Sequence, residues 1–176
     1  MKHIVPLPSL EVLQSLLTYD PSTGILAWKP NLPYAKQRQA GKPAGTMSKG
    51  GYLRTSIGRR MYANNRIAWK MHYGTDPVGV VDHEDGDKLN NRIANMRDAS
   101  QGKNTYNQVR RVDNTTGYKG VVFNRQRQRF TANLKVNGVA IKRRFFETPE
   151  AANDFVRAER ERLHGDFTCH GDRELV

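Results

Sequence analysis

Hydrophobic residues recur at helical spacing in two segments of the first half of the chain. Residues 9–18 carry four leucines on one face, and Ser9 precedes them as a suitable N-cap. Residues 65–73 show a similar pattern that ends at Gly74, and glycine commonly terminates helices. We therefore expect two short helices. Between them the pattern predicts strands at 25–28 and 52–57, separated by an exposed loop rich in glycine and proline at 29–51.

A β-hairpin followed by a helix is predicted in the middle of the chain. An apolar run at residues 78–81 predicts a strand that leads directly into Asp82 and His83. A polar turn follows, and the chain is expected to return as a short second strand at 93–97. A helix over residues 100–108, capped by the serine at its start, completes this prediction.

The last third of the chain predicts a small sheet with one helix. Three strand-like runs follow a turn-rich segment, and an Asn-Gly pair, the strongest short hairpin signal, joins the second and third. Thr148 and Pro149 match the N-cap and first position of a helix, and residues 168–176 are expected to be a frayed tail. The runs are 118–124, 129–136 and 139–146, and the apolar helix face comprises Ala151, Ala152, Phe155, Ala158 and Leu163.

The chain is strongly basic. Its 176 residues include 29 Lys and Arg against 17 Asp and Glu, a formal net charge of +12, which favours nucleic acid as a partner. Residues 110–147 hold ten basic and two acidic residues, so the positive surface is expected mainly in the C-terminal module. The single cysteine, Cys169, excludes an internal disulfide and fits a reducing compartment. With no recognisable membrane-spanning run or signal peptide, we expect a cytoplasmic protein.

Four carboxylates nevertheless lie within residues 82–87. Acidic side chains repel phosphate, so their clustering in a basic protein needs a reason, and a bound cation is one. An Asp-His pair before a glycine turn is, taken alone, more often a solvated turn. An EF-hand calcium loop is excluded, because no glutamate stands twelve positions along from a suitable first aspartate. The adjacent histidine and the asparagines that follow indicate a catalytic site.

The spacing of these polar residues resembles the HNH (ββα-metal) endonucleases of phage type, including homing-like members. Asn95 follows His83 by 12 residues and Asn104 follows by 9 more, as in the version in which asparagine replaces the last histidine. The resemblance covers about residues 50–108. The chain departs from the family's pattern at Asn65, where members often have the histidine of a His-Arg pair.

The resemblance implies a role for each residue of the motif. Asp82 and Asn104 would ligate a divalent metal ion, Mg²⁺ or another such as Mn²⁺. His83 would act as general base on the attacking water, and Asn95 would hold the hairpin so that His83 faces the scissile phosphate. The chemistry agrees, because Mg²⁺ prefers oxygen ligands and histidine can accept a proton near neutral pH.

Other charged residues around the motif have less specific interpretations. Glu84, Asp85 and Asp87 are interpreted as turn residues and are not assigned to the metal. Arg97 either contacts a DNA phosphate or pairs with the neighbouring Asp98, and the sequence does not favour one of these. Zinc binding near Cys169 is disfavoured, because a structural zinc site needs four ligands.

Residues 114–167 resemble an AP2-type DNA-binding domain. The resemblance rests on the segments Gly117–Val121, Phe130–Ala132, Phe146–Ala152 and Leu163–Gly165, and implies a three-stranded sheet that lies on the DNA major groove. Alternation places Phe130, Ala132, Leu134 and Val136 on one face and Arg129, Thr131, Asn133 and Lys135 on the other. Val122 and Arg144 depart from the pattern, so phosphate contacts are favoured over base readout. The basic residues expected to bind DNA are Arg125, Arg127, Arg129, Lys135, Lys142 and Arg144.

These features predict an α+β protein with an N-terminal HNH ββα-metal nuclease domain and a small three-stranded antiparallel sheet with one packed helix. The expected function is metal-dependent cleavage of double-stranded DNA, by nicking or at a specific site, without a small-molecule cofactor. The alternative is a non-catalytic DNA-binding protein on a decayed HNH scaffold. An RNA-binding protein is disfavoured, because no aromatic stacking platform is evident. The expected parts are a leading region 1–50, the nuclease 51–110, the AP2-like domain 114–167 and the tail 168–176.

Overall fold

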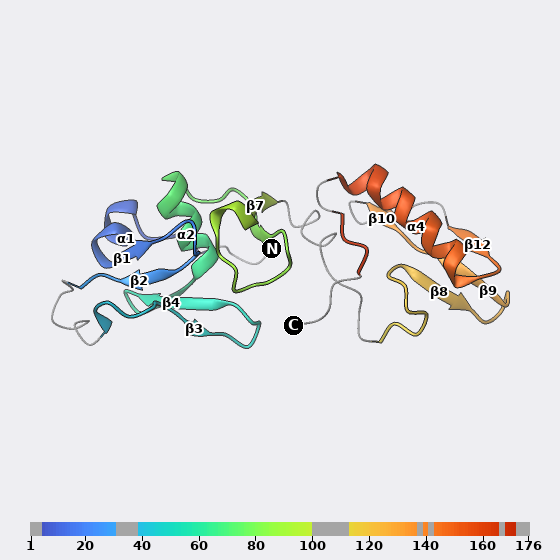
Figure 1. Ribbon diagram of the computed structural model, residues 1–176, viewed down its shortest axis with the longest axis horizontal. Coiled ribbons are helices and arrows are strands. Elements are labelled where there is room, and N and C mark those ends of the chain that lie inside the picture. Colours follow the sequence, from blue (N-terminus) through green and yellow to red (C-terminus); the bar gives the residue numbers. More distant parts are fainter. Residues whose placement is uncertain are drawn as a thin grey trace. The chain divides into compact units, whose positions relative to one another are not determined.

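The computed structural model describes residues 5–30, 39–99, 113–136, 139–140, 143–165 and 168–171. The chain divides into two compact units, residues 1–98 and 99–176. Each unit combines helix with small antiparallel sheets, so the predicted α+β class is confirmed (Figure 1). Among the residues that the structure describes, no helix is long and apolar enough to cross a membrane.

The first unit begins with a helix and a hairpin, as predicted. Helix α1 spans Leu10–Leu16, and the Ser9 hydroxyl caps it by accepting a hydrogen bond from a first-turn amide. The helix is shorter than expected because Leu17 already has extended backbone, with φ −127°. Strands β1 (Leu17–Tyr19) and β2 (Leu26–Trp28) then pair antiparallel.

A three-stranded antiparallel sheet follows, with the order β3-β4-β5. Its strands are β3 (Thr46–Met47), β4 (Leu53–Ile57) and β5 (Arg60–Ala63). The sequence predicted β4 but missed β3 and β5. The β4–β5 turn consists of Gly58 and Arg59, both at positive φ (56° and 63°), which is the backbone of a tight two-residue hairpin. Asn-Gly and Asp-Gly are the sequence signals that predict such turns, whereas Gly-Arg is not one of them, and for this reason β5 was missed.

Strand β5 runs directly into helix α2 (Asn64–Tyr73), which ends at Gly74 with φ 78°, as predicted. The hairpin that follows differs from the prediction in its bounds. Strand β6 spans Val80–His83, and the chain returns through the 3-10 turn η2 (Ile93–Asn95) into β7 (Met96–Ala99). The amides of residues 78 and 79 donate to the carboxylate of Asp98 instead of to a strand partner, so β6 begins two residues later than predicted. The predicted helix at 100–108 lies outside the described residues.

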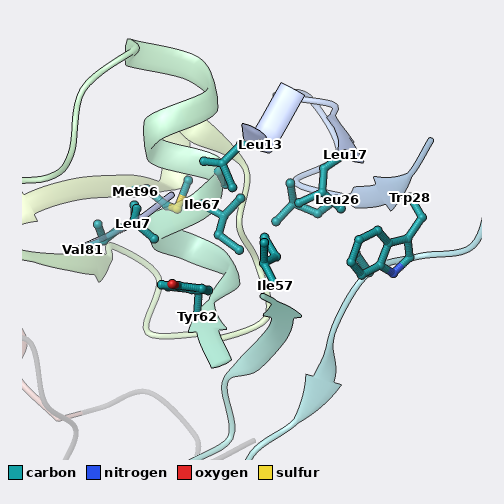
Figure 2. Packing of buried hydrophobic residues seen from close by; sticks show 12 residues of the cluster. Leu7, Leu13, Leu17, Leu26, Trp28, Ile57, Tyr62, Ile67, Val81 and Met96 are labelled. Atoms are coloured by element: carbon teal, nitrogen blue, oxygen red, sulfur yellow. The ribbon is translucent and has the colours of Figure 1, made fainter. Parts of the chain in front are cut away.

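Buried side chains from both helices and the surrounding strands form one core in the first unit. Leu13 of α1 and Ile67 of α2 are fully buried and lie next to Leu17 and Ile57, as Figure 2 shows. Val81 of β6 joins the same cluster. Each such side chain stabilises the fold by about 1.5–3 kcal/mol, so the core fixes the strand that carries Asp82 and His83.

The second unit contains a three-stranded sheet with one packed helix, as predicted. The sheet order is β12-β9-β8, and β10 and β11 form a separate antiparallel pair. The two long predicted strands are each divided into two shorter ones. The first is divided because the Asn133 amide bonds to the Gly120 carbonyl and leads the backbone out of β9. The strands are β8 (Val121–Asn124), β9 (Arg129–Ala132), β10 (Lys135–Val136), β11 (Val139–Ala140) and β12 (Arg144–Phe146).

Helix α4 spans Pro149–His164 and is capped by the Thr148 hydroxyl, as predicted. Its predicted apolar face is partly wrong, because two of the expected alanines, Ala151 and Ala158, are exposed. The buried row consists of Ala152, Val156 and Arg160, which pack against β8 and β9. Arg160 tolerates burial because its guanidinium donates to the Lys119 carbonyl.

The tail is also better packed than expected. Cys169 is buried, and its carbonyl accepts a hydrogen bond of 2.9 Å from the Lys119 ammonium. The Thr168 hydroxyl donates to the Arg160 carbonyl at 3.3 Å. Residues 168–171 therefore belong to the second unit, which corrects the prediction of fraying for this part of the tail.

Gly24 should be much less tolerant of alanine than Gly41, although both have positive φ (76° and 72°). A Cβ on Gly24 would lie 2.5 Å from the Arg92 amide nitrogen, whereas a Cβ on Gly41 would meet nothing within 4 Å. We expect Gly41→Ala to cost about 1–2 kcal/mol from backbone strain alone. Gly24→Ala should cost roughly 1–3 kcal/mol more from the clash. Urea unfolding of both variants measures the difference, and equal losses would contradict this packing.

Candidate functional site

Helix α2 anchors strand β6, which carries the candidate catalytic residues. The Asn65 side chain is buried and donates to the Val81 carbonyl at 3.1 Å. Arg66 donates to the Gly79 carbonyl at 3.3 Å. Asn65 stands where the resemblance implied the histidine of a His-Arg pair, and together with Arg66 it holds the backbone on both sides of Val80.

Asp82 and His83 lie at the end of β6 and are buried, with exposed fractions of 6% and 3%. The Asp82 carboxylate Oδ2 lies 3.0 Å from Nε of Arg97, which belongs to the paired strand β7. The partner of Arg97 in the structure is therefore Asp82 and not the neighbouring Asp98, whereas the predicted contact with a DNA phosphate stays a prediction. Asp98 instead accepts the backbone amides before β6.

His83 is oriented by Asn91, a residue to which the sequence interpretation gave no role. The His83 Nε2 lies 3.0 Å from Oδ1 of Asn91, and Asn91 is itself 3% exposed. An amide oxygen has no hydrogen to give, so Nε2 is the donor in this pair. The neutral ring then has its lone pair on Nδ1, which makes Nδ1 the nitrogen that can accept a proton.

The N-terminal hairpin holds the segment that contains Asn91. The Tyr19 hydroxyl donates to the Asn91 carbonyl at 2.8 Å. Arg92 donates to the Ser22 carbonyl at 2.9 Å, and the Ile93 amide donates to the Pro21 carbonyl at 3.2 Å. The turn between β1 and β2 therefore fixes the residue that orients the histidine. No local sequence signal indicates this link, because about seventy residues separate its two sides.

Asn95 closes the loop that follows His83. Its Oδ1 accepts the Asp85 amide at 3.0 Å, and its Nδ2 donates to the Asp85 carboxylate at 2.9 Å and the Asn90 carbonyl at 2.8 Å. Burial opposes ionisation of Asp85, but the hydrogen bonds from Asn90 and Asn95 and the nearby His83 lower its pKa overall. Asp87 accepts the Leu89 amide at 2.9 Å. Asp85 and Asp87 are therefore turn residues, as interpreted from the sequence.

Tyr52, immediately before β4, lies beside the site and was missed by sequence reasoning. Its ring centroid is 6.1 Å from that of His83, and the Lys88 ammonium lies 5.2 Å from the Tyr52 ring centroid. Burial, and then the charge of Asp82, raise the pKa of the Tyr52 hydroxyl. Lys88 also donates to the Gly50 carbonyl at 3.0 Å, which ties the β3–β4 turn to the loop after His83.

One of the two predicted metal ligands lies in the described part of the chain. Asp82 offers a carboxylate oxygen at the end of a strand, which suits a hard divalent cation. The second predicted ligand, Asn104, lies outside the described residues. Within the described ranges, no group of three or more His, Cys, Asp and Glu side chains could hold a metal ion. The donor chemistry of Asp82 fits Mg²⁺, but the carboxylate already binds a cation, Arg97.

The predicted DNA-binding residues of the second unit lie in different places. Arg127 lies over the Phe145 ring, with 4.6 Å between its guanidinium carbon and the ring centroid, and Arg129 pairs with Glu147 at 3.3 Å. Arg144 instead lies 4.9 Å from the ring centroid of Phe155, which belongs to α4. Arg125 is exposed in the β8–β9 turn and Lys135 is exposed on β10, whereas Lys142 lies outside the described residues.

Alternation predicted the two faces of β9 correctly at most positions but not the exposure of Thr131. Ala132 is buried against α4, as expected. Thr131 belongs to the opposite face with Arg129, yet it is only 4% exposed. It lies on the central strand between Val122 and Phe145, whose side chains cover it from both sides. The face away from α4 therefore combines apolar and aromatic side chains with arginines.

Comparison with known proteins identifies the family. Residues 62–106 match the HNH endonuclease family, and this match lies in the middle of the chain rather than at its N-terminal end. Protein 3.8 of Escherichia phage T7 is 31% identical over 100 residues, which cover 56% of this chain and 82% of the phage protein. No solved structure matches. The chain therefore belongs to the same family as phage T7 protein 3.8 and contains an HNH endonuclease domain at residues 62–106.

Proposed function

We propose that this protein is a metal-dependent endonuclease that hydrolyses a phosphodiester bond of double-stranded DNA. One observation carries the proposal: His83 is oriented by a buried amide and stands next to a buried carboxylate, within the region that matches the HNH family. A turn histidine in solvent needs neither burial nor an orienting partner. The arrangement is therefore that of a general base held in one tautomer.

In the proposed reaction, Nδ1 of His83 accepts the proton of the attacking water. Asn91 keeps Nε2 protonated and prevents the ring from rotating, because its own backbone is held by the N-terminal hairpin. Asn95 acts as a positioning residue, since it fixes the backbone of the loop directly after the histidine. These contacts leave few conformations open to His83, and restricted geometry accelerates a reaction between two held groups.

A divalent metal would be held by Asp82 and Asn104. When bound, it would stabilise the negative charge that develops on the phosphate and the leaving oxygen. Asp82 must first exchange its ion pair with Arg97, and the substrate must reach a histidine that is 3% exposed. Arg97 would then be placed to meet the phosphate that accompanies the metal.

The second unit would anchor the enzyme to DNA through its AP2-like sheet. The proposed contacts come from Arg125, Arg127, Arg129 and Lys135, with Phe145 and Val122 on the same sheet contributing apolar area. The proposal is supported by the arginine stacked on Phe145 and by the exposure of Val122, which is 51%. Arg144 is a weaker candidate, because its guanidinium lies over Phe155 on the side of α4.

His83→Ala should abolish cleavage of supercoiled plasmid DNA in the presence of Mg²⁺. General-base catalysis typically contributes about 10²–10⁴-fold in rate, so we expect a loss of that order with DNA binding retained. His72→Ala is the matched control, since His72 is an exposed histidine on α2 of the same unit. If the wild-type protein cuts no DNA with Mg²⁺, Mn²⁺ or other divalent ions, the nuclease proposal fails. DNA binding without cleavage would then favour a decayed scaffold.

Asn95→Ala should slow cleavage through positioning rather than through loss of chemistry. The variant removes three hydrogen bonds that close the loop after His83. We expect kcat to fall by roughly tenfold, because each of the three hydrogen bonds contributes about 0.5–1.5 kcal/mol to holding the loop. Amide exchange at Asp85 should accelerate in the same variant. Unchanged amide exchange at Asp85 together with an unchanged kcat would show that Asn95 does not position His83.

Arg97→Gln should tighten binding of Mn²⁺, because a divalent cation no longer competes with an arginine for Asp82. The ion pair spans 3.0 Å and both partners are largely buried, with side-chain exposures of 17% and 6%. A positive guanidinium 3.0 Å from the Asp82 carboxylate both occupies this ligand and repels a second cation. We therefore expect the dissociation constant for Mn²⁺, measured by titration calorimetry, to be about tenfold lower in Arg97→Gln. Arg59→Gln provides the control, since Arg59 is exposed in the β4–β5 turn. Equal affinities for the two variants would show that Asp82 does not bind the metal.

A further inference from the structure

The first unit contains a long basic segment that the sequence interpretation overlooked. No acidic residue occurs from position 21 to position 75, whereas ten basic residues do. This segment is as basic as the one in the second unit that was assigned the positive surface. The ten residues are Lys29, Lys36, Arg38, Lys42, Lys49, Arg54, Arg59, Arg60, Arg66 and Lys70.

Part of this charge gathers around an open cavity of about 250 Å³ on the β3-β4-β5 sheet. Arg54 and Ser56 point outward from β4, since the alternate residues Thr55 and Ile57 are buried. Lys42 comes from the segment before β3 and lines the same cavity. We call this the β4 surface, defined by Lys42, Thr46, Arg54, Ser56 and Met61.

Strand β4 connects this surface to the candidate site. Tyr52, immediately before β4, lies beside His83, and Arg54 follows two residues later on the strand. A strand rises about 3.4 Å per residue, so the backbones of these two residues are about 7 Å apart. The β4 surface therefore begins two residues along the chain from the side chain that lies beside His83.

We propose that the β4 surface binds the phosphodiester backbone of the substrate duplex next to the bond that is cut. This inference rests on the proposed function, because it places the substrate at that same site. Lys42 and Arg54 supply the charge, and the hydroxyls of Thr46 and Ser56 supply uncharged donors. Such side chains are typical of phosphate contacts that position a protein on DNA without reading bases.

Arg54 is already partly ordered for this role. Its guanidinium donates to the Met61 carbonyl at 3.0 Å across the sheet, while the side chain stays exposed. An arginine has five donors, so one such bond leaves others for a phosphate. The exposed Met61 and Pro43 beside it offer apolar contact to the sugars. Arg59 in the β4–β5 turn and Arg60 at the start of β5 add further positive charge beyond the end of β4.

The salt dependence of DNA binding tests this surface in the full-length protein. Lys42→Gln and Arg54→Gln would each be titrated with a short mixed-sequence duplex in EDTA over a range of salt concentrations. The slope of log K against log salt is negative, and each lost phosphate contact decreases its magnitude by about 0.9. We expect that decrease for each variant, and about twice that decrease for the double variant. Arg162→Gln is the control of equal charge change, since Arg162 is exposed on α4 and pairs with Glu159.

The outcomes separate this proposal from the nuclease proposal. Slopes equal to that of Arg162→Gln would overturn the β4 surface even if the wild-type protein cuts DNA. Shallower slopes for the Lys42 and Arg54 variants of a protein that never cuts would support the β4 surface and reject the nuclease. Far-ultraviolet circular dichroism of each variant confirms the fold, and both substituted side chains are exposed, so folding should be unaffected.

Discussion

The hydrogen bond between His83 and Asn91 is the constraint on which the candidate site depends. It fixes the tautomer and the plane of the imidazole, and it is only as rigid as Asn91 itself. That rigidity comes from the β1–β2 turn, through Tyr19 and through the absence of a side chain at Gly24. The N-terminal hairpin therefore helps to hold the candidate site, although it precedes the region that matches the HNH family.

A second constraint is electrostatic. The unit that contains the HNH-family match carries a buried carboxylate at its candidate site, and the Arg97 guanidinium neutralises it. An unpaired buried carboxylate would be costly, so the ion pair stabilises the hairpin while no metal is present. A divalent cation performs the same neutralisation with two charges. The proposed site therefore exchanges one cation for another and does not need to create or remove a buried charge.

Local signals predicted the elements that local chemistry specifies. Ser9, Gly74 and Thr148 each mark a helix end through a cap that involves neighbouring residues, and all three predictions are confirmed. Strand β5 was missed because its turn uses Arg59 at positive φ, which is uncommon for arginine. The buried Arg160 was missed because its partner is a backbone carbonyl.

The contacts that hold the candidate site could not be predicted, because they join residues that lie far apart in the sequence. Asn91 and Tyr19 are 72 residues apart, and their contact appears only when two hairpins pack on one core. The Asp-His pair could be identified from its spacing to later asparagines, but the spacing carries no information about what holds the histidine. Arg97 shows the same limit, since its neighbour in sequence is Asp98 and its partner in the structure is Asp82.

The acidic residues of the first unit support this distinction between local and distant partners. Asp20, Asp85, Asp87 and Asp98 each accept backbone amides a few residues away or across a strand end, and the bonds from Ser22 and Thr23 lower the pKa of Asp20 to about 2. These carboxylates shape turns, and ionisation strengthens that role. Asp82 is instead buried at a strand end and held by an arginine side chain. A cation can replace a side chain more readily than it can replace a backbone amide, and for that reason Asp82 is the carboxylate suited to bind a metal.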